Sequence, residues 1–195
     1  MGSPERKDFR LVHRLRVRWA EVDLQRIVFN PHYLMYLDTA FTEYWRVLAV
    51  PYEIIPTMLG GDLYVKKSTL EYHGSARLDD LLDVGLKCQR IGNSSLLFVG
   101  AIFRGDSLLV SSELVYVFAD PRTQTSRPVP KVLRDLFNTF EAGMPTLDVR
   151  LGDWRDLGDR ASALRRAVFM QELGLPALLD YDAADDCAVH CLVCN

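Results

Sequence analysis

The chain has 195 residues, 49% of them hydrophobic, which is enough for one full core and a small second unit. A net charge of −3 and a pI near 5.8 give no electrostatic reason to expect nucleic acid as a partner. No stretch approaches the roughly 18–20 apolar residues that span a bilayer, and the first residues lack the apolar core of a secretory signal. We therefore expect a cytoplasmic globular protein that binds neither membrane nor nucleic acid.

The first predicted elements are a strand and a long helix. Residues 9–19 alternate charged and apolar side chains, which is typical of a strand. From Pro31 to Ala49, apolar residues instead recur at three- and four-residue spacing, and a proline in the first turn suits a helix. Because this helix is apolar on most of its surface, we expect other structure to wrap around it.

Four strand-like runs follow, at residues 63–73, 81–91, 95–104 and 108–118. Gly92-Asn93-Ser94 and Gly105-Asp106-Ser107 favour tight hairpin turns, because glycine and asparagine tolerate the positive φ that such turns need. The order predicts an antiparallel meander. One long helix followed by consecutive antiparallel strands indicates an α+β hotdog fold, in which the sheet wraps around the central helix.

The remaining sequence predicts a domain end and a partial second unit. Prolines end the sheet, and residues 132–140 form an amphipathic pattern typical of a short helix. We place the first domain at residues 1–142. Residues 143–195 are expected to form a linker and a partial α/β segment, with a strand at 146–151 and a helix at 161–173.

The most informative block is VRWAEVDLQRIVFNPHYLMYLD, residues 17–38. Here the sequence resembles the 4-hydroxybenzoyl-CoA thioesterase family of hotdog proteins, over about the first 142 residues. The resemblance implies hydrolysis of an acyl-CoA to a free acid and coenzyme A. In that family the Asp that matches Asp23 attacks the thioester carbonyl or activates a water, and the amide at the helix start, here near Asn30, polarises the carbonyl. Coenzyme A is then part of the substrate, and no separate cofactor or metal is implied.

Physical chemistry agrees with this assignment. A thioester carbonyl gains negative charge in the transition state, which unpaired N–H groups at a helix N-terminus stabilise. Removing one such donor typically costs about a hundredfold to a thousandfold in rate. A nearby carboxylate such as Asp23 then serves as nucleophile or general base. The alternative is that Asp23 only caps a turn or the helix, and we expect Glu21 to be a solvated charge at the end of the strand.

One residue departs from the family pattern. The family usually has glycine three residues after the catalytic Asp, where this chain has Arg26. We expect the loop either to adopt a different conformation or to bring a cation close to the site.

Other candidates lie on the central helix. Asp38 or Glu43 would match hotdog thioesterases whose carboxylate is on this helix, although pairing with Arg46 in a polar stripe explains them more simply. His32 and Tyr33 lie in the first turn, where either side chain could contact the acyl group. The alternative places Tyr33 in the core and His32 on the surface.

Basic residues are candidates for the phosphates of coenzyme A. Lys66, Lys67, Arg77 and Arg90 could meet them at a subunit edge, or they could simply be solvated. The resemblance implies a homodimer or homotetramer, because hotdog active sites usually lie between subunits.

Two rival functions remain open: a thioesterase acting on acyl carrier protein, and a non-catalytic acyl-CoA binding module. The hydratase branch of the fold fits less well. Its signature pairs an Asp with a His a few residues later, whereas His32 lies nine positions after Asp23.

The segment from Trp154 to His190 resembles the opening of a GNAT N-acetyltransferase domain. The glycine-rich loop that binds the acetyl-CoA pyrophosphate in GNAT enzymes is absent before Asn195, so acetyltransferase activity does not follow. Cys187, His190, Cys191 and Cys194 could be read as zinc ligands. Alternating Val189, Cys191 and Val193 instead favours a strand of small apolar residues, and we expect no metal.

Overall fold

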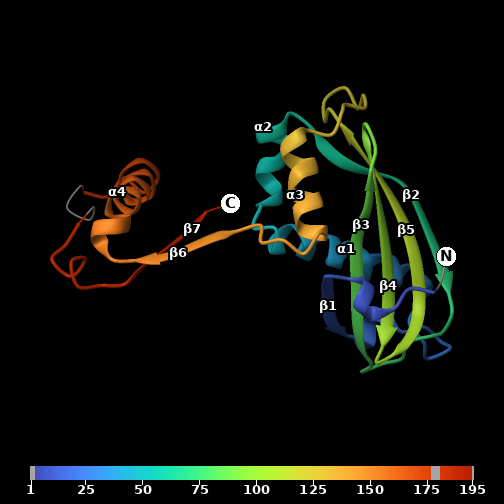
Figure 1. Cartoon of the computed structure of the whole chain (residues 1–195). Helices are drawn as coiled ribbons and strands as arrows, with labels where there is room; N and C mark the ends of the chain where they lie inside the picture. The colour runs from blue at the N-terminus through green and yellow to red at the C-terminus, as the bar shows by residue number, and fades with distance from the viewer. Residues whose placement is uncertain (1–2, 177–180, 195) are drawn as a thin grey trace. The chain divides into compact units, whose positions relative to one another are not determined.

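The computed structural model describes residues 3–176 and 181–194 (Figure 1). The chain divides into two compact units, Met1–Met144 and Pro145–Asn195. Among the described residues, no helix has the length and apolar character needed to cross a membrane.

The first unit contains a five-stranded sheet and three helices. Its elements are β1 (Leu11–Arg16), α1 (Asn30–Val47), α2 (Ile55–Leu59), β2 (Asp62–Tyr72), β3 (Leu81–Ile91), β4 (Ser95–Arg104), β5 (Ser107–Ala119) and α3 (Lys131–Glu141), with 3₁₀ turns at Arg6–Asp8, Trp19–Glu21 and Tyr52–Ile54. Each predicted strand and helix of this unit lies within a few residues of its expected position.

The order of the strands is β1-β3-β4-β5-β2, and every pair is antiparallel. Short turns join β3 to β4 and β4 to β5, and Gly105 has a φ of 58° in the second turn. The prediction of a meander was wrong for β2, which pairs with β5 and not with β3. Residues 73–80 form a connection long enough to cross the end of the sheet, whereas a two- or three-residue turn forces its strands to be neighbours.

Helix α1 packs on one face of the sheet (Figure 1). Its side chains Leu37, Ala40 and Tyr44 are fully buried, and Phe41 stacks on Tyr116 of β5 with ring centroids 4.4 Å apart. Gly100 of β4 lies under the helix. A Cβ there would come within 2.6 Å of Leu37 Cδ2 and of the Ser112 hydroxyl, so glycine allows the helix to approach the sheet closely.

Helix α3 packs against the C-terminal half of α1 through Phe137 and Phe140, whose rings contact Tyr44. The Tyr44 hydroxyl donates a 2.5 Å hydrogen bond to Glu141 Oε1, which also accepts the Cys88 N–H at 2.7 Å. Burial raises the pKa of the Glu141 carboxyl, against the opposing effect of these two donors.

The second unit has β6 (Asp148–Gly152), α4 (Trp154–Arg165), a π-helical segment (Arg166–Glu172) and β7 (His190–Cys194), which is antiparallel to β6. The helix was expected from residue 161 but begins at Trp154, because Asp153 caps it by accepting the Asp156 N–H. The core of the second unit consists of Leu157, Ala161 and Leu192, with Trp154 packed against them.

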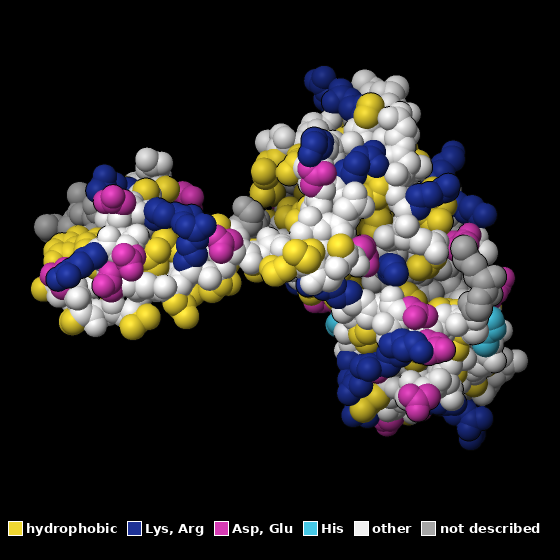
Figure 2. All heavy atoms as spheres, viewed as in Figure 1, with side chains coloured by type: hydrophobic (Ala, Val, Ile, Leu, Met, Phe, Trp, Pro, Cys, Tyr) yellow, Lys and Arg dark blue, Asp and Glu magenta, His cyan; other side chains and the backbone are white. Residues whose placement is uncertain are grey.

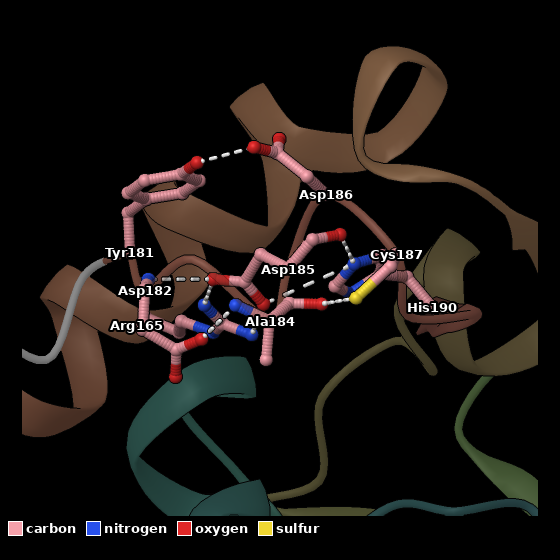
Figure 3. Close-up of polar contacts among 8 residues, drawn as sticks. All are labelled: Arg165, Tyr181, Asp182, Ala184, Asp185, Asp186, Cys187 and His190. Atoms are coloured by element: carbon pink, nitrogen blue, oxygen red, sulfur yellow. Dashed lines mark hydrogen bonds and ion pairs between the residues drawn. The ribbon is translucent and has the colours of Figure 1, made fainter.

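A buried carboxylate organises the loop before β7 (Figure 3). Arg165 donates two hydrogen bonds to Asp185, at 2.6 and 2.8 Å, and this pair holds the pKa of Asp185 at about 2. The Cys187 thiol donates to the Ala184 carbonyl, and His190 Nε2 lies 3.0 Å from the Asp185 carbonyl oxygen. The side chains of Asp185, Cys187 and His190 therefore all have polar contacts within this unit.

The face of β6 and β7 turned away from α4 is apolar and exposed. Its side chains are Val149, Leu151, Cys191 and Val193, with Val189 just before β7. Figure 2 shows hydrophobic side chains along this part of the unit. The predicted strand of alternating small apolar residues is thus present in β7, with its apolar side chains at the surface.

Candidate active site

Asp23 lies in a tight hairpin between the first 3₁₀ turn after β1 and the start of α1. Val22 and Val28 form an antiparallel bridge, the Asp23 N–H donates to the Ile27 carbonyl, and the Arg26 N–H donates to the Asp23 carbonyl, both at 2.9 Å. Asp23 Oδ1 accepts the Gln25 N–H at 2.8 Å. One carboxylate oxygen therefore caps the turn, as the alternative interpretation expected, while Oδ2 has no hydrogen-bond partner among the described residues.

Arg26 has a φ of 61°, in the left-handed region that glycine adopts without strain. A three-residue hairpin loop places a left-handed residue at this position. The loop therefore keeps a glycine-like conformation despite the arginine. The Arg26 side chain is exposed, and no ion pair joins it to Asp23 in the part of the chain that the structure describes.

Glu21 is only 3% exposed, so the prediction of a solvated charge was wrong. Its carboxylate accepts hydrogen bonds from the Tyr36 hydroxyl at 2.8 Å and from the Arg18 N–H and Nε at 2.7 Å each. Burial by itself would raise the pKa of Glu21, but the bonds from Arg18 and Tyr36 outweigh burial and hold the pKa below its usual range. Strand alternation could not reveal this, because the 3₁₀ turn Trp19–Glu21 changes the direction of the side chain.

The same residue connects the loop to the helix through its backbone. The Phe29 N–H donates to the Glu21 carbonyl at 2.9 Å, and α1 begins at the next residue, Asn30. Asn30 is exposed, and its N–H is one of the first-turn amides that have no acceptor within the helix. Asp23 is two residues after Glu21, and Asn30 is one residue after Phe29. The hydrogen bond between Phe29 and Glu21 therefore keeps the two predicted site residues at one end of the helix.

His32 and Tyr33 have different environments. Tyr33 is 2% exposed and its hydroxyl accepts the Ala76 N–H at 2.9 Å, which places this residue in the core. His32 is half-buried beside the Phe29 ring, and its Nδ1 is buried without a hydrogen-bond partner in the described structure. Of the two, only His32 has a polar atom left unsatisfied near the start of the helix.

Of the two carboxylates on α1, the pairing with Arg46 that was the simpler explanation is present for Glu43, whereas Asp38 has no ion pair in the part of the chain that the structure describes. Glu43 pairs with Arg46, and Asp38 is exposed, with its carbonyl accepting the Thr42 hydroxyl. Neither residue is joined to the Asp23 hairpin by a hydrogen bond among the described residues.

The structure separates the predicted basic residues into two groups. Arg77 follows Ala76, whose carbonyl accepts the Val28 N–H at 2.9 Å, so Arg77 lies next to the Asp23 hairpin. Lys66 and Lys67 are exposed on the edge strand β2. Tyr72 of β2 contacts Tyr33, and Lys67 is five positions earlier on the strand, a separation of about 17 Å.

Arg90 is exposed on β3. A hollow of about 720 Å³ lies on the sheet surface and is lined by the N-terminal segment, by residues of β2, β3, β4 and β5, and by His73 just after β2; Phe9, Glu71, Lys87 and Glu113 are among the other lining residues. Lys87 and Glu113 alternate with the buried residues that face α1, so the hollow opens mainly on the opposite face of the sheet. It does not include Asp23, and we do not assign it to the thioester.

Among the described residues, no group of three or more His, Cys, Asp or Glu side chains is placed to hold a metal ion. All four cysteines are free thiols.

An antiparallel sheet with one long helix packed on its face is the arrangement of a hotdog fold. Comparison with known proteins agrees: residues 25–111 match the model of the thioesterase superfamily. The first unit is therefore a hotdog domain that matches the thioesterase superfamily.

Individual proteins are similar to this chain in sequence or in fold. The chain is 27% identical over 118 residues to the acyl-CoA thioester hydrolase YbgC of Escherichia coli O6:H1, covering 60% of this chain and 87% of that protein. A thioesterase from Thermus thermophilus, solved with coenzyme A and Zn, has a TM-score of 0.62 at 21% identity and covers 71% of this chain and 98% of its own. A hypothetical protein from Aquifex aeolicus has a TM-score of 0.61 at 22% identity, covering 65% of this chain and 98% of its own. None of these matches bears on the acetyltransferase resemblance of the second unit, which stays a prediction.

Proposed function

We propose that this protein hydrolyses an acyl-CoA thioester to a free carboxylic acid and coenzyme A. The observation that carries the proposal is the hairpin that holds Asp23 beside the start of α1, in a domain that matches the thioesterase superfamily. The name of the YbgC relative, an acyl-CoA thioester hydrolase, supports the same reaction.

In this proposal the Asn30 N–H, aided by the helix dipole, donates to the thioester oxygen as it gains charge. Asp23 Oδ2 either attacks the carbonyl carbon, forming an anhydride that water then cleaves, or removes a proton from an attacking water. In both cases the carbon–sulfur bond breaks and coenzyme A leaves as the thiolate, which takes up a proton. The reaction needs no cofactor beyond the substrate.

We further propose that a second copy of the chain completes the site. Large apolar side chains on the hairpin and on the elements before and after it are exposed: Trp19 is 79% exposed, Leu24 is fully exposed, and Phe29 and Met35 are about half exposed. Exposed apolar clusters of this kind mark interaction surfaces. A partner would also be needed for Lys66 or Lys67 to reach a substrate held at Asp23, whereas Arg77 already lies next to the hairpin of its own subunit. Sedimentation equilibrium should then give a dimer or tetramer and not a monomer.

The proposed reaction is tested by the release of free thiol from short, long and aromatic acyl-CoAs. We expect Asp23→Asn to lower kcat by at least about a hundredfold, because the amide is neither a base nor a nucleophile. Asp38→Asn, an exposed carboxylate on α1, is the matched control and should retain activity. Circular dichroism checks that both variants fold.

The rival functions give different results. Turnover of acyl groups on a carrier protein, with none on coenzyme A esters, would assign the site to carrier-bound substrates. Tight binding of acyl-CoA with no turnover of any ester would make the domain a binding module and overturn the proposed reaction.

A further inference from the structure

We propose that Glu21 is a positioning residue for Asp23, and that Tyr36 and Arg18 hold Glu21 in that role. This inference rests on the proposed function, since it concerns how the same carboxylate hairpin is kept in place for reaction. Neither Tyr36 nor Arg18 was identified from the sequence as part of the site.

The backbone of Glu21 fixes both ends of the hairpin. Its carbonyl accepts the Phe29 N–H, and the bridge between Val22 and Val28 closes the loop one residue further in. A shift of Glu21 would therefore move Asp23 on one side of the loop and the start of α1 on the other.

The side chain of Glu21 adds a second attachment, to the body of the helix. Tyr36 is 4% exposed, and its hydroxyl donates to Glu21 Oε2 from about two turns into α1. The same oxygen accepts the Arg18 N–H, and Oε1 accepts Arg18 Nε. The carboxylate thus ties the end of the strand segment, the hairpin and the helix together.

The contacts of the Glu21 carboxylate differ from those of a surface ion pair and suit a residue that holds its neighbours in place. A buried carboxylate needs several donors, and bonds to an ionised acceptor are stronger and shorter than those between neutral groups. An interaction that spans the loop and a rigid helix limits the movement of Asp23 relative to the helix amides. Displacements of about 1 Å near a reacting group can cost about a hundredfold in rate.

The test compares two variants of this contact with one matched control. Tyr36→Phe removes the hydroxyl that ties the helix to Glu21, and Glu21→Gln keeps the shape of the side chain but removes its charge. The control is Tyr44→Phe, because Tyr44 is also buried on α1 and also donates its hydroxyl to a glutamate, Glu141, away from the hairpin. If Glu21→Gln fails to fold, Tyr36→Phe alone decides the question.

Two measurements on the full chain are needed. Steady-state kinetics with the acyl-CoA that the wild type hydrolyses should show kcat lowered about ten- to a hundredfold in Tyr36→Phe and Glu21→Gln, with KM changed less than about twofold. Amide hydrogen exchange should show faster exchange at Asp23, Val28 and Phe29, whose N–H groups are bonded in and around the hairpin. Tyr44→Phe should change neither kcat nor exchange at these three amides.

The possible failures are distinguishable. Wild-type turnover with unchanged kcat in both Glu21 and Tyr36 variants would overturn the positioning role and leave the proposed function standing. An equal loss of kcat in Tyr44→Phe would also overturn it, because the effect would then be a general loosening of α1. No turnover by the wild type on any ester would overturn the proposed function and the positioning role with it.

Discussion

Arg26 occupies the left-handed position of the Asp23 hairpin, with a φ of 61°. For a residue with a Cβ, this conformation costs roughly 1–2 kcal/mol of free energy relative to glycine. The strain lies next to the candidate catalytic carboxylate, and the Arg26 backbone N–H still closes the turn onto the Asp23 carbonyl. Arg26 thus occupies a backbone conformation that glycine would adopt without strain.

This strain gives a stability prediction. We expect Arg26→Gly to raise the free energy of unfolding by about 0.5 kcal/mol, because relief of the left-handed conformation exceeds the added freedom of glycine in the unfolded chain. Arg26→Val should lower it by about 1 kcal/mol or more, since β-branched residues tolerate positive φ least. Urea unfolding at constant m-value measures both changes. Equal stability of the Val and Gly variants would show that the loop is not strained at this position.

The packing of α1 on the sheet depends on one glycine of β4. A Cβ at Gly100 would come within 2.6 Å of both Leu37 Cδ2 and the Ser112 hydroxyl, so these side chains or the helix would have to move. Overpacking of a buried site typically costs about 1–3 kcal/mol. Because α1 also carries Asn30 at its start, a displaced helix would move the candidate site as well.

We therefore expect Gly100→Ala to lower the free energy of unfolding by about 1–3 kcal/mol. Combined with Leu37→Ala, which creates space at the same contact, it should cost less than the sum of the two single changes. A double-mutant cycle measured by urea unfolding tests this coupling. Strict additivity would mean that the two side chains do not compete for the same space.

At the scale of the whole molecule, the two units differ in the size of their cores. The main core of the first unit combines residues of α1, α3 and all five strands, whereas the second is built around Leu157, Ala161 and Leu192. The second unit also exposes the apolar face of β6 and β7. A unit of about 50 residues with so few buried side chains has little hydrophobic stabilisation of its own.

We expect a fragment ending at Met144 to unfold cooperatively and to retain the wild-type kcat. Every residue of the proposed site, including Lys66 and Lys67 of a second copy, belongs to this unit. The Aquifex aeolicus chain, 98% of which is covered, shows that a protein of about this extent forms the fold. The fragment 145–195 should show little stable structure by circular dichroism when produced alone. An aggregated or inactive first fragment would contradict this division.

The sequence by itself determined the strands and main helices of the first unit and singled out the residues of the candidate site. Helix α1 and strands β3, β4 and β5 were predictable because their apolar spacing and their glycine turns are local properties of the chain. Asp23 was singled out by a resemblance, and its position seven residues before Asn30 placed it near the start of α1, whereas the hairpin that holds it came only from the structure. The roles of these two residues remain proposals.

Only the tertiary structure decided the features that depend on distant residues. The pairing of β2 with β5 is set by a connection that crosses the sheet, which no local pattern specifies. The burial of Glu21 depends on the hydroxyl of Tyr36, which lies fifteen residues away on another element. The sequence shows only a charged residue at position 21, whereas the fold buries its carboxylate and supplies the hydrogen-bond donor. Local periodicity reports which faces are apolar, whereas the partners that satisfy a buried charge are chosen by the packing of the whole domain.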